Sequence, residues 1–117
     1  MAFRSADFEG ANTVEGYGPG FFRVAGQVIR GGVLVVGENA HPWGGLSDEA
    51  PLLALAGQVD VLFLGTGADP AYPPRDLFAR LAAAGVQAEA MPSPQAARTY
   101  NVTRSEGRRV ACALLPL

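Results

Sequence analysis

Short apolar runs separated by glycine-containing breaks mark the front third of the chain as rich in β-strands. Such runs, joined by tight turns, predict a strand meander. The runs are Phe21–Val24, Gln27–Arg30 and Val33–Val36. The first break, Ala25-Gly26, puts alanine where a type I′ turn needs a positive φ. We therefore expect that loop to be longer than two residues.

The middle of the chain predicts a loop, a short helix and a buried strand. The loop runs from Gly37 to Leu46, and Ser47 or Asp48 is expected to cap a helix that stops at Gly57. The near-continuous apolar run Val59–Leu64 is typical of a strand covered on both faces.

The rear part continues with helix, strand, helix and strand. Ser93 before Pro94 indicates an N-cap followed by proline at the first helical position. The expected bounds of the four elements are Pro73–Gly85, Val86–Met91, Ser93–Arg104 and Arg109–Leu115. Strands that alternate with helices favour a three-layer α/β fold with a partly parallel sheet.

Length and composition support one domain with a shared core. The chain has 117 residues, of which 49% are apolar and 17% charged, and this balance excludes the disordered class. The sequence contains no linker between its front and rear parts. We expect a single α/β domain over residues 1–117, with residues 1–13 as an irregular N-terminal arm.

Charge and hydropathy exclude several classes of partner. The net charge is −2, and all nine basic residues are arginines, so no nucleic acid partner and no lysine Schiff base are expected. The longest apolar run, Val110–Leu115, falls short of the ~20 residues that a membrane span needs. The first ten residues contain Asp7 and Glu9 and do not match a signal peptide. These features predict a cytoplasmic protein.

A glycine-containing loop after the buried strand is the first candidate site. Gly65, Thr66 and Gly67 follow the apolar run, where converging backbone amides bind phosphates or carboxylates in other α/β proteins. Pro70 stands at the third glycine position, so the dinucleotide fingerprint is incomplete. Two interpretations stay open: a tight structural turn and an anion-binding loop.

A run of four polar or aromatic residues on the last predicted helix is the second candidate. Arg98, Thr99, Tyr100 and Asn101 point in different directions, so they cannot all line one pocket. In a purely structural interpretation, Tyr100 is buried, Arg98 pairs with an acid such as Glu106, and Asn101 caps the helix end. In a functional interpretation, Arg98 and Thr99 recognise an anion or a protein partner.

The remaining reactive side chains do not form a recognisable catalytic or metal site. His41 is the only histidine and Cys112 the only cysteine, too few for a usual zinc site. Cys112 lies in an apolar strand, where a thiol has a raised pKa and low reactivity. We expect no cofactor, no metal and no catalytic residues.

Six stretches of the chain, taken in order, carry a family resemblance. They are Tyr17–Phe21, Phe22–Val24, Pro42-Trp43, Leu62–Gly67, Ala96–Val102 and Glu106–Val110. In this order and spacing they resemble the Mth-type domain family of unknown function over residues 14–115. Its relatives include a mitochondrial respiratory complex I assembly factor and an adipogenesis-associated protein.

The resemblance implies a three-layer fold with a central mixed sheet whose final strand is antiparallel to its neighbours. It implies no established catalytic activity for bacterial members and a non-catalytic helper role in complex assembly for the mitochondrial one. A shared surface of Trp43, Gly65, Thr66, Gly67, Arg98, Thr99 and Asn101 follows from the matching positions. The leading hypothesis is a non-enzymatic assembly protein whose partners are respiratory-complex subunits. The alternative is a binder of, or enzyme acting on, a small anionic ligand held by the Gly65–Gly67 loop and Arg98.

Overall fold

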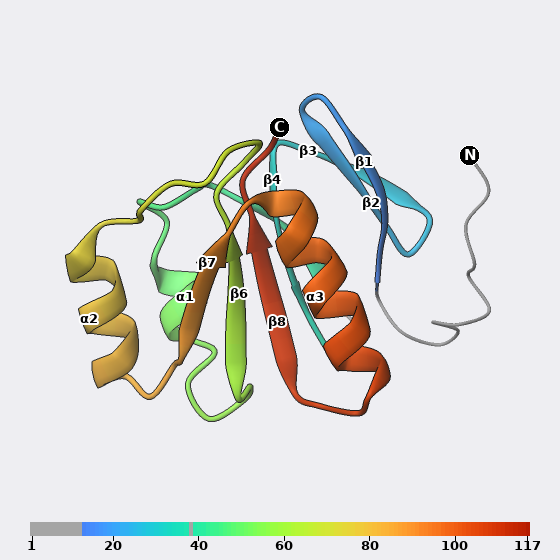
Figure 1. The fold of residues 1–117 in the computed structure, drawn as a ribbon. Coiled ribbons are helices and arrows are strands. Elements are labelled where there is room, and N and C mark those ends of the chain that lie inside the picture. The colour runs from blue at the N-terminus through green and yellow to red at the C-terminus, as the bar shows by residue number, and fades with distance from the viewer. Residues whose placement is uncertain (1–12, 38) are drawn as a thin grey trace.

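A three-stranded sheet packs beside a five-stranded sheet in the computed structural model, which describes residues 13–37 and 39–117 (Figure 1). The expected irregular arm of residues 1–13 lies, apart from residue 13, outside the described residues. The arm and the extent of the domain over residues 1–117 stay predictions.

The small sheet contains the first two strands of the predicted meander and one strand before them that the prediction lacked. The expectation that Val33–Val36 continues the same meander is wrong, because this segment lies in the large sheet and pairs with the last strand of the chain. Its antiparallel order is β1-β2-β3, and the strands are β1 Val14–Gly18, β2 Phe21–Val24 and β3 Gln27–Arg30. Val24 pairs with Gln27, so the expectation of a longer loop at Ala25-Gly26 is wrong. Ala25 adopts a φ of +51°, and the Glu15 carboxylate holds the turn by accepting the Gly26 N–H at 2.7 Å.

The large sheet has the order β5-β4-β8-β6-β7. Its strands are β4 Gly32–Val36, β5 Asn39–Trp43, β6 Val61–Gly65, β7 Ala88–Met91 and β8 Val110–Leu114. Strand β8 runs antiparallel to β4 but parallel to β6. The expectation of a last strand antiparallel to both neighbours is therefore wrong, because β8 returns to the sheet after a helix, as β7 does.

The loop expected over residues 37–46 contains a strand, β5, which pairs with β4 along its whole length. Of its five side chains only Trp43 is buried, and Pro42 interrupts the pattern. Proline is tolerated because β5 lies at the edge of the sheet, where one side of the backbone needs no partner. The hydrophobic pattern could not reveal such a strand.

Three helices complete the described structure: α1 Ala50–Leu53, α2 Arg75–Ala83 and α3 Ser93–Ser105. The N-cap of α1 is Glu49, without a side-chain hydrogen bond, so the prediction of Ser47 or Asp48 as cap is wrong. The Asp48 carboxylate does not cap the helix but accepts the Gly44 N–H at 3.0 Å. Helices α2 and α3 lie close to their predicted bounds.

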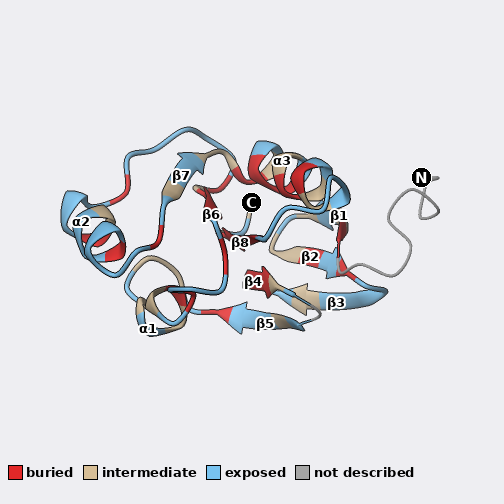
Figure 2. Cartoon of the chain, turned by 90° about the horizontal axis from the view of Figure 1, so that it is seen from below, coloured by how far each residue is buried: buried red, intermediate tan, exposed pale blue. Residues whose placement is uncertain are grey.

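The five-stranded sheet forms the middle of three layers (Figure 2). Helix α3 and the small sheet cover one face, and α1 and α2 cover the other (Figure 1). Alternate residues of β8 show the division, because Cys112 packs toward α3 whereas Ala111 and Ala113 pack toward α1 and α2. Phe22 of β2 and Tyr100 of α3 share one buried cluster, which confirms that the front and rear parts have a common core.

Candidate functional site

The seven predicted site residues lie in three separate parts of the fold. Trp43 ends the edge strand β5, Gly65–Gly67 follow the carboxyl end of β6, and the other three lie on α3. Those three are Arg98, Thr99 and Asn101. Each part has a different role in the structure.

Trp43 is a structural residue. Its side chain is 4% exposed and belongs to the core under α1 and α2, on the opposite face of the sheet from α3. The indole Nε1–H donates to the Asp48 carbonyl oxygen at 3.0 Å and so ties the segment before α1 to the sheet. Trp43 therefore does not share a surface with Arg98.

Ser93 joins the glycine loop to the start of α3. Its hydroxyl accepts the Gly67 N–H at 2.9 Å and donates to the Leu115 carbonyl oxygen at 2.7 Å. Its own N–H donates to the Gly67 carbonyl oxygen at 2.8 Å. The N-cap of α3 is Pro92, so the prediction of Ser93 as N-cap is wrong: the hydroxyl serves the neighbouring loops instead.

Gly65 lets the chain segments at this junction approach each other closely. A Cβ on residue 65 would lie 2.6 Å from the Ser93 Oγ and 2.8 Å from the Leu114 Cδ2. Gly67 has a φ of +92°, which favours glycine for a different reason. Both glycines are thus explained by packing and backbone geometry.

The amides of the loop are already occupied. The Thr66 N–H donates to the Met91 carbonyl oxygen at 2.8 Å, and the Gly67 N–H donates to Ser93. The Thr66 hydroxyl donates to the Asp69 carbonyl oxygen at 2.9 Å. These contacts favour the interpretation of the loop as a structural turn. The Thr66 and Gly67 N–H groups, which an anion-binding loop would use, already have partners within the protein.

Asn101 fastens the first strand to α3. Its Oδ1 accepts the Val14 N–H at 3.0 Å, and its Nδ2 donates to the Val14 carbonyl oxygen at 2.8 Å. The expectation that Asn101 caps the helix end is therefore wrong. The sequence does not indicate Val14 as the partner, because 87 residues separate the two positions. The Thr99 carbonyl oxygen accepts the Thr103 hydroxyl at 2.6 Å.

Tyr100 is fully buried, as the structural interpretation predicts, whereas Arg98 is exposed. The ion pairs among the described residues join Arg80 to Glu49 and Arg109 to Asp60. The expected pairing of Arg98 with Glu106 is absent from them. Arg98 is thus available to a ligand or partner.

A groove of about 390 Å³ lies between β1 and α3, and Arg98 lines it. Two half-exposed apolar side chains, Tyr17 at 47% and Val102 at 49%, belong to the same lining. Asn101 also lines the groove and fixes its β1 wall at Val14. Residues 65–67 do not line it, so this cavity does not join the glycine loop to Arg98.

The buried ionisable groups are not activated for chemistry. Burial raises the pKa of the Cys112 thiol, and burial also raises the pKa of the Tyr100 phenol, which the nearby Arg104 guanidinium partly opposes. Within the described residues, no three histidine, cysteine or acidic side chains gather closely enough to hold a metal ion. In the same part of the chain, no helix has the length and apolarity to cross a membrane.

Comparison with other proteins gives relatives along almost the whole chain. An uncharacterized protein from Rhodobacter capsulatus is 57% identical over 117 residues, covering 100% of this chain and 94% of the relative. NADH dehydrogenase (ubiquinone) 1 alpha subcomplex assembly factor 3 from Danio rerio is 31% identical over 107 residues. That match covers 86% of this chain and 62% of the assembly factor.

Solved structures show the same fold. A crystal structure described as an outer membrane protein from Bartonella henselae has a TM-score of 0.82 and 28% identity, covering 92% of this chain and 96% of its own. A Mth938-like domain from Bordetella pertussis has a TM-score of 0.74 and 28% identity, covering 99% of this chain and 90% of its own. The family described as "Protein of unknown function (DUF498/DUF598)" matches residues 14–115. The resemblance to Mth-type domains is confirmed, and the chain belongs to the DUF498/DUF598 family.

Proposed function

We propose that this chain is a non-enzymatic protein that binds subunits of a respiratory complex during assembly and docks them at the groove between β1 and α3. The observation that carries the proposal is Arg98, an exposed guanidinium without an ion-pair partner among the described residues, in a groove that also contains Tyr17 and Val102. The similarity to the zebrafish assembly factor supports the class of partner. The proposed location is the cytoplasm.

The composition of the groove suits a protein partner. Tyrosine and arginine are enriched in protein interfaces, because each offers a large contact area together with polar groups. Tyr17 lies on a strand and Arg98 and Val102 on a helix, so the three side chains are held on rigid elements. The Asn101 clamp on Val14 keeps the two walls of the groove together.

Affinity capture with charge-reversal variants tests the proposal. The tagged full chain is incubated with a membrane-containing lysate, and the recovered respiratory-complex subunits are quantified. Arg98→Glu is expected to reduce their recovery strongly, because a negative charge would then face the partner groups that bind the positive charge of Arg98. Arg30→Glu is the matched control, since Arg30 is an exposed arginine on β3 outside the groove.

Two results would contradict the proposal. One is equal recovery with Arg98→Glu and Arg30→Glu when both variants retain the wild-type circular dichroism spectrum. The other is recovery of respiratory-complex subunits by the wild-type chain no better than by an unrelated domain of similar size and charge. Loss with both variants would indicate a general charge effect and would also count against the groove.

A further inference from the structure

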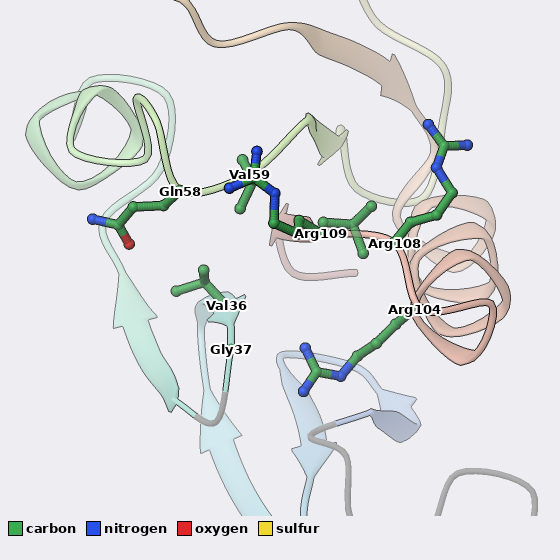
Figure 3. A pocket seen from close by; sticks show the side chains of 9 residues that line it. Val36, Gly37, Gln58, Val59, Arg104, Arg108 and Arg109 are labelled. Atoms are coloured by element: carbon green, nitrogen blue, oxygen red, sulfur yellow. The ribbon is translucent and has the colours of Figure 1, made fainter.

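A second cavity lies at the end of the sheet opposite the glycine loop, beside the last turn of α3 (Figure 3). Its volume is about 440 Å³, within the range of small-molecule sites. Val36, Val59 and Val110 supply apolar lining, and Arg104 and Arg109 supply guanidinium groups. The predicted site did not include any of these residues.

The guanidinium groups of Arg109 and Arg104 differ in the hydrogen bonds that they make within the protein. Arg109 donates to the Asp60 carboxylate at 2.9 Å and to the Gly57 carbonyl oxygen at 3.4 Å. Arg104, in contrast, has a buried Nε without a hydrogen-bond partner among the described residues. It also belongs to neither ion pair of that part of the chain. The Arg104 side chain also hydrogen-bonds the Tyr100 phenol, so its unused hydrogen-bonding capacity at the cavity wall lies at Nε.

Carbonyl groups in the last turn of α3 accept backbone hydrogen bonds, which reduces their repulsion of an anion at this place. The Val102 carbonyl oxygen accepts the Glu106 N–H at 3.2 Å, and the Arg104 carbonyl oxygen accepts the Gly107 N–H at 2.9 Å. The Thr103 carbonyl oxygen also accepts a backbone N–H within this turn. The carbonyl groups of this turn therefore do not compete with an anion for the Arg104 side chain.

A guanidinium beside apolar side chains selects a particular ligand chemistry. A carboxylate accepts two parallel hydrogen bonds from a guanidinium, and a short apolar body on that carboxylate can pack against Val36, which is partly exposed, in front of the buried Val59 and Val110. A purely polar anion would not make this apolar contact. In Figure 3 the Arg108 guanidinium points away from those of Arg104 and Arg109, so Arg104 is the anchor.

We propose that this cavity binds a small carboxylate with a short aliphatic or aromatic body, and that Arg104 holds the carboxylate. The site lies on different residues from the β1–α3 groove, so it stands independently of the proposed assembly function. It adds a small-molecule ligand to a fold for which only a protein partner is otherwise proposed.

Nuclear magnetic resonance titration of the full chain with hexanoate tests this site. We expect saturable shifts of the Arg104 Nε–H signal and of the Val36, Val59 and Val110 amide signals. Arg104→Gln should weaken hexanoate binding by about 10- to 100-fold, because it removes a charge-assisted hydrogen bond. Arg30→Gln is the control and should leave the affinity unchanged, since Arg30 is an exposed arginine on β3 that lines neither this cavity nor the β1–α3 groove.

Two further probes separate charge from the apolar body. Hexan-1-ol has a similar body without the carboxylate, and inorganic phosphate has negative charge without the body, so both should bind more weakly than hexanoate. Equal binding of hexan-1-ol, or of phosphate, would overturn the proposed ligand class. An absence of saturable shifts, or equal affinities of Arg104→Gln and Arg30→Gln, would overturn the site. Arg104→Lys, which keeps the charge but lacks Nε, replaces Arg104→Gln if the latter loses its dispersed spectrum.

Discussion

Ser93 and Gly67 exchange two hydrogen bonds: the Ser93 hydroxyl accepts the Gly67 N–H at 2.9 Å, and the Ser93 N–H donates to the Gly67 carbonyl oxygen at 2.8 Å. The hydroxyl also donates to the Leu115 carbonyl oxygen. One buried side chain thereby joins the loop after β6, the start of α3 and the end of β8. This explains why a conspicuous glycine loop forms a structural junction.

Replacing Ser93 by alanine should destabilise the fold by about 1–3 kcal/mol, because it leaves the buried Gly67 N–H and the partly buried Leu115 carbonyl oxygen without this partner. Urea unfolding followed by circular dichroism measures the change. Ser105→Ala is the matched control, since the Ser105 hydroxyl contacts only the Val102 carbonyl oxygen at an exposed position. A destabilisation by Ser93→Ala no larger than that of the control would contradict the junction.

The sequence predicts the elements that bury a regular apolar stripe and misses those that do not. The continuous apolar character of Val61–Gly65 reflects burial on both faces of β6, so that strand was predictable. Strand β5 buries only Trp43 of its five residues and owes its existence to pairing with β4. Pairing with a neighbouring strand leaves no hydrophobic pattern in the sequence of an edge strand.

The candidate site was predicted by residue type but not by partner. Ser93 and Asn101 are residues typical of helix caps, yet both use their side chains to hold distant segments. Such contacts depend on tertiary structure, which residue spacing does not encode. Arg104 carried no signal either, because an arginine in the last turn of a helix is ordinary, and only burial of its Nε distinguishes it.

Asn101→Ala should release the amino end of β1 from α3. Two hydrogen bonds to the Val14 backbone are lost, so we expect a destabilisation of about 1–2 kcal/mol. Hydrogen exchange of the Val14 amide should also accelerate, which is the more specific readout. Gln95→Ala, at an exposed position on the same helix, is the control. Unchanged exchange at Val14 in a folded Asn101→Ala variant would refute the clamp.

Cys112 should not react with thiol reagents in the folded protein. The side chain is fully buried in β8, and burial raises the pKa of the thiol above its ordinary value of 9.0. Labelling with Ellman's reagent near neutral pH should therefore follow global unfolding and accelerate with urea. Rapid labelling without denaturant would show that β8 is accessible in the native state.

The same burial predicts a dependence of stability on alkaline pH. A raised pKa in the folded state keeps the thiol neutral, so its contribution is complete below pH 9.0. The contribution is lost as pH rises above that value, because the unfolded chain then releases the proton more readily. Cys112→Ala should show a weaker decline of stability than the wild type above about pH 9. If the stabilities of the wild type and of Cys112→Ala decline equally with pH, the thiol is not buried and neutral in the folded protein.

The ion pair between Glu49 and Arg80 should make stability depend on acid pH. The guanidinium donates to the carboxylate at 2.7 and 2.5 Å, and these hydrogen bonds lower the pKa of Glu49 below its ordinary value of 4.5. The pair therefore contributes fully above pH 4.5, and the contribution disappears as pH falls through the lowered pKa of the folded state.

The measurement for this ion pair is the difference in melting temperature between the wild type and Glu49→Gln. We expect the difference to be small at pH 7, because both side chains are partly exposed, and to shrink further at pH 3 or in high salt. Glu89→Gln, at an exposed position on β7, is the control for a carboxylate outside the two ion pairs of the described residues. A difference for Glu49→Gln that does not change with pH would show that the carboxylate charge is not what joins α1 to α2.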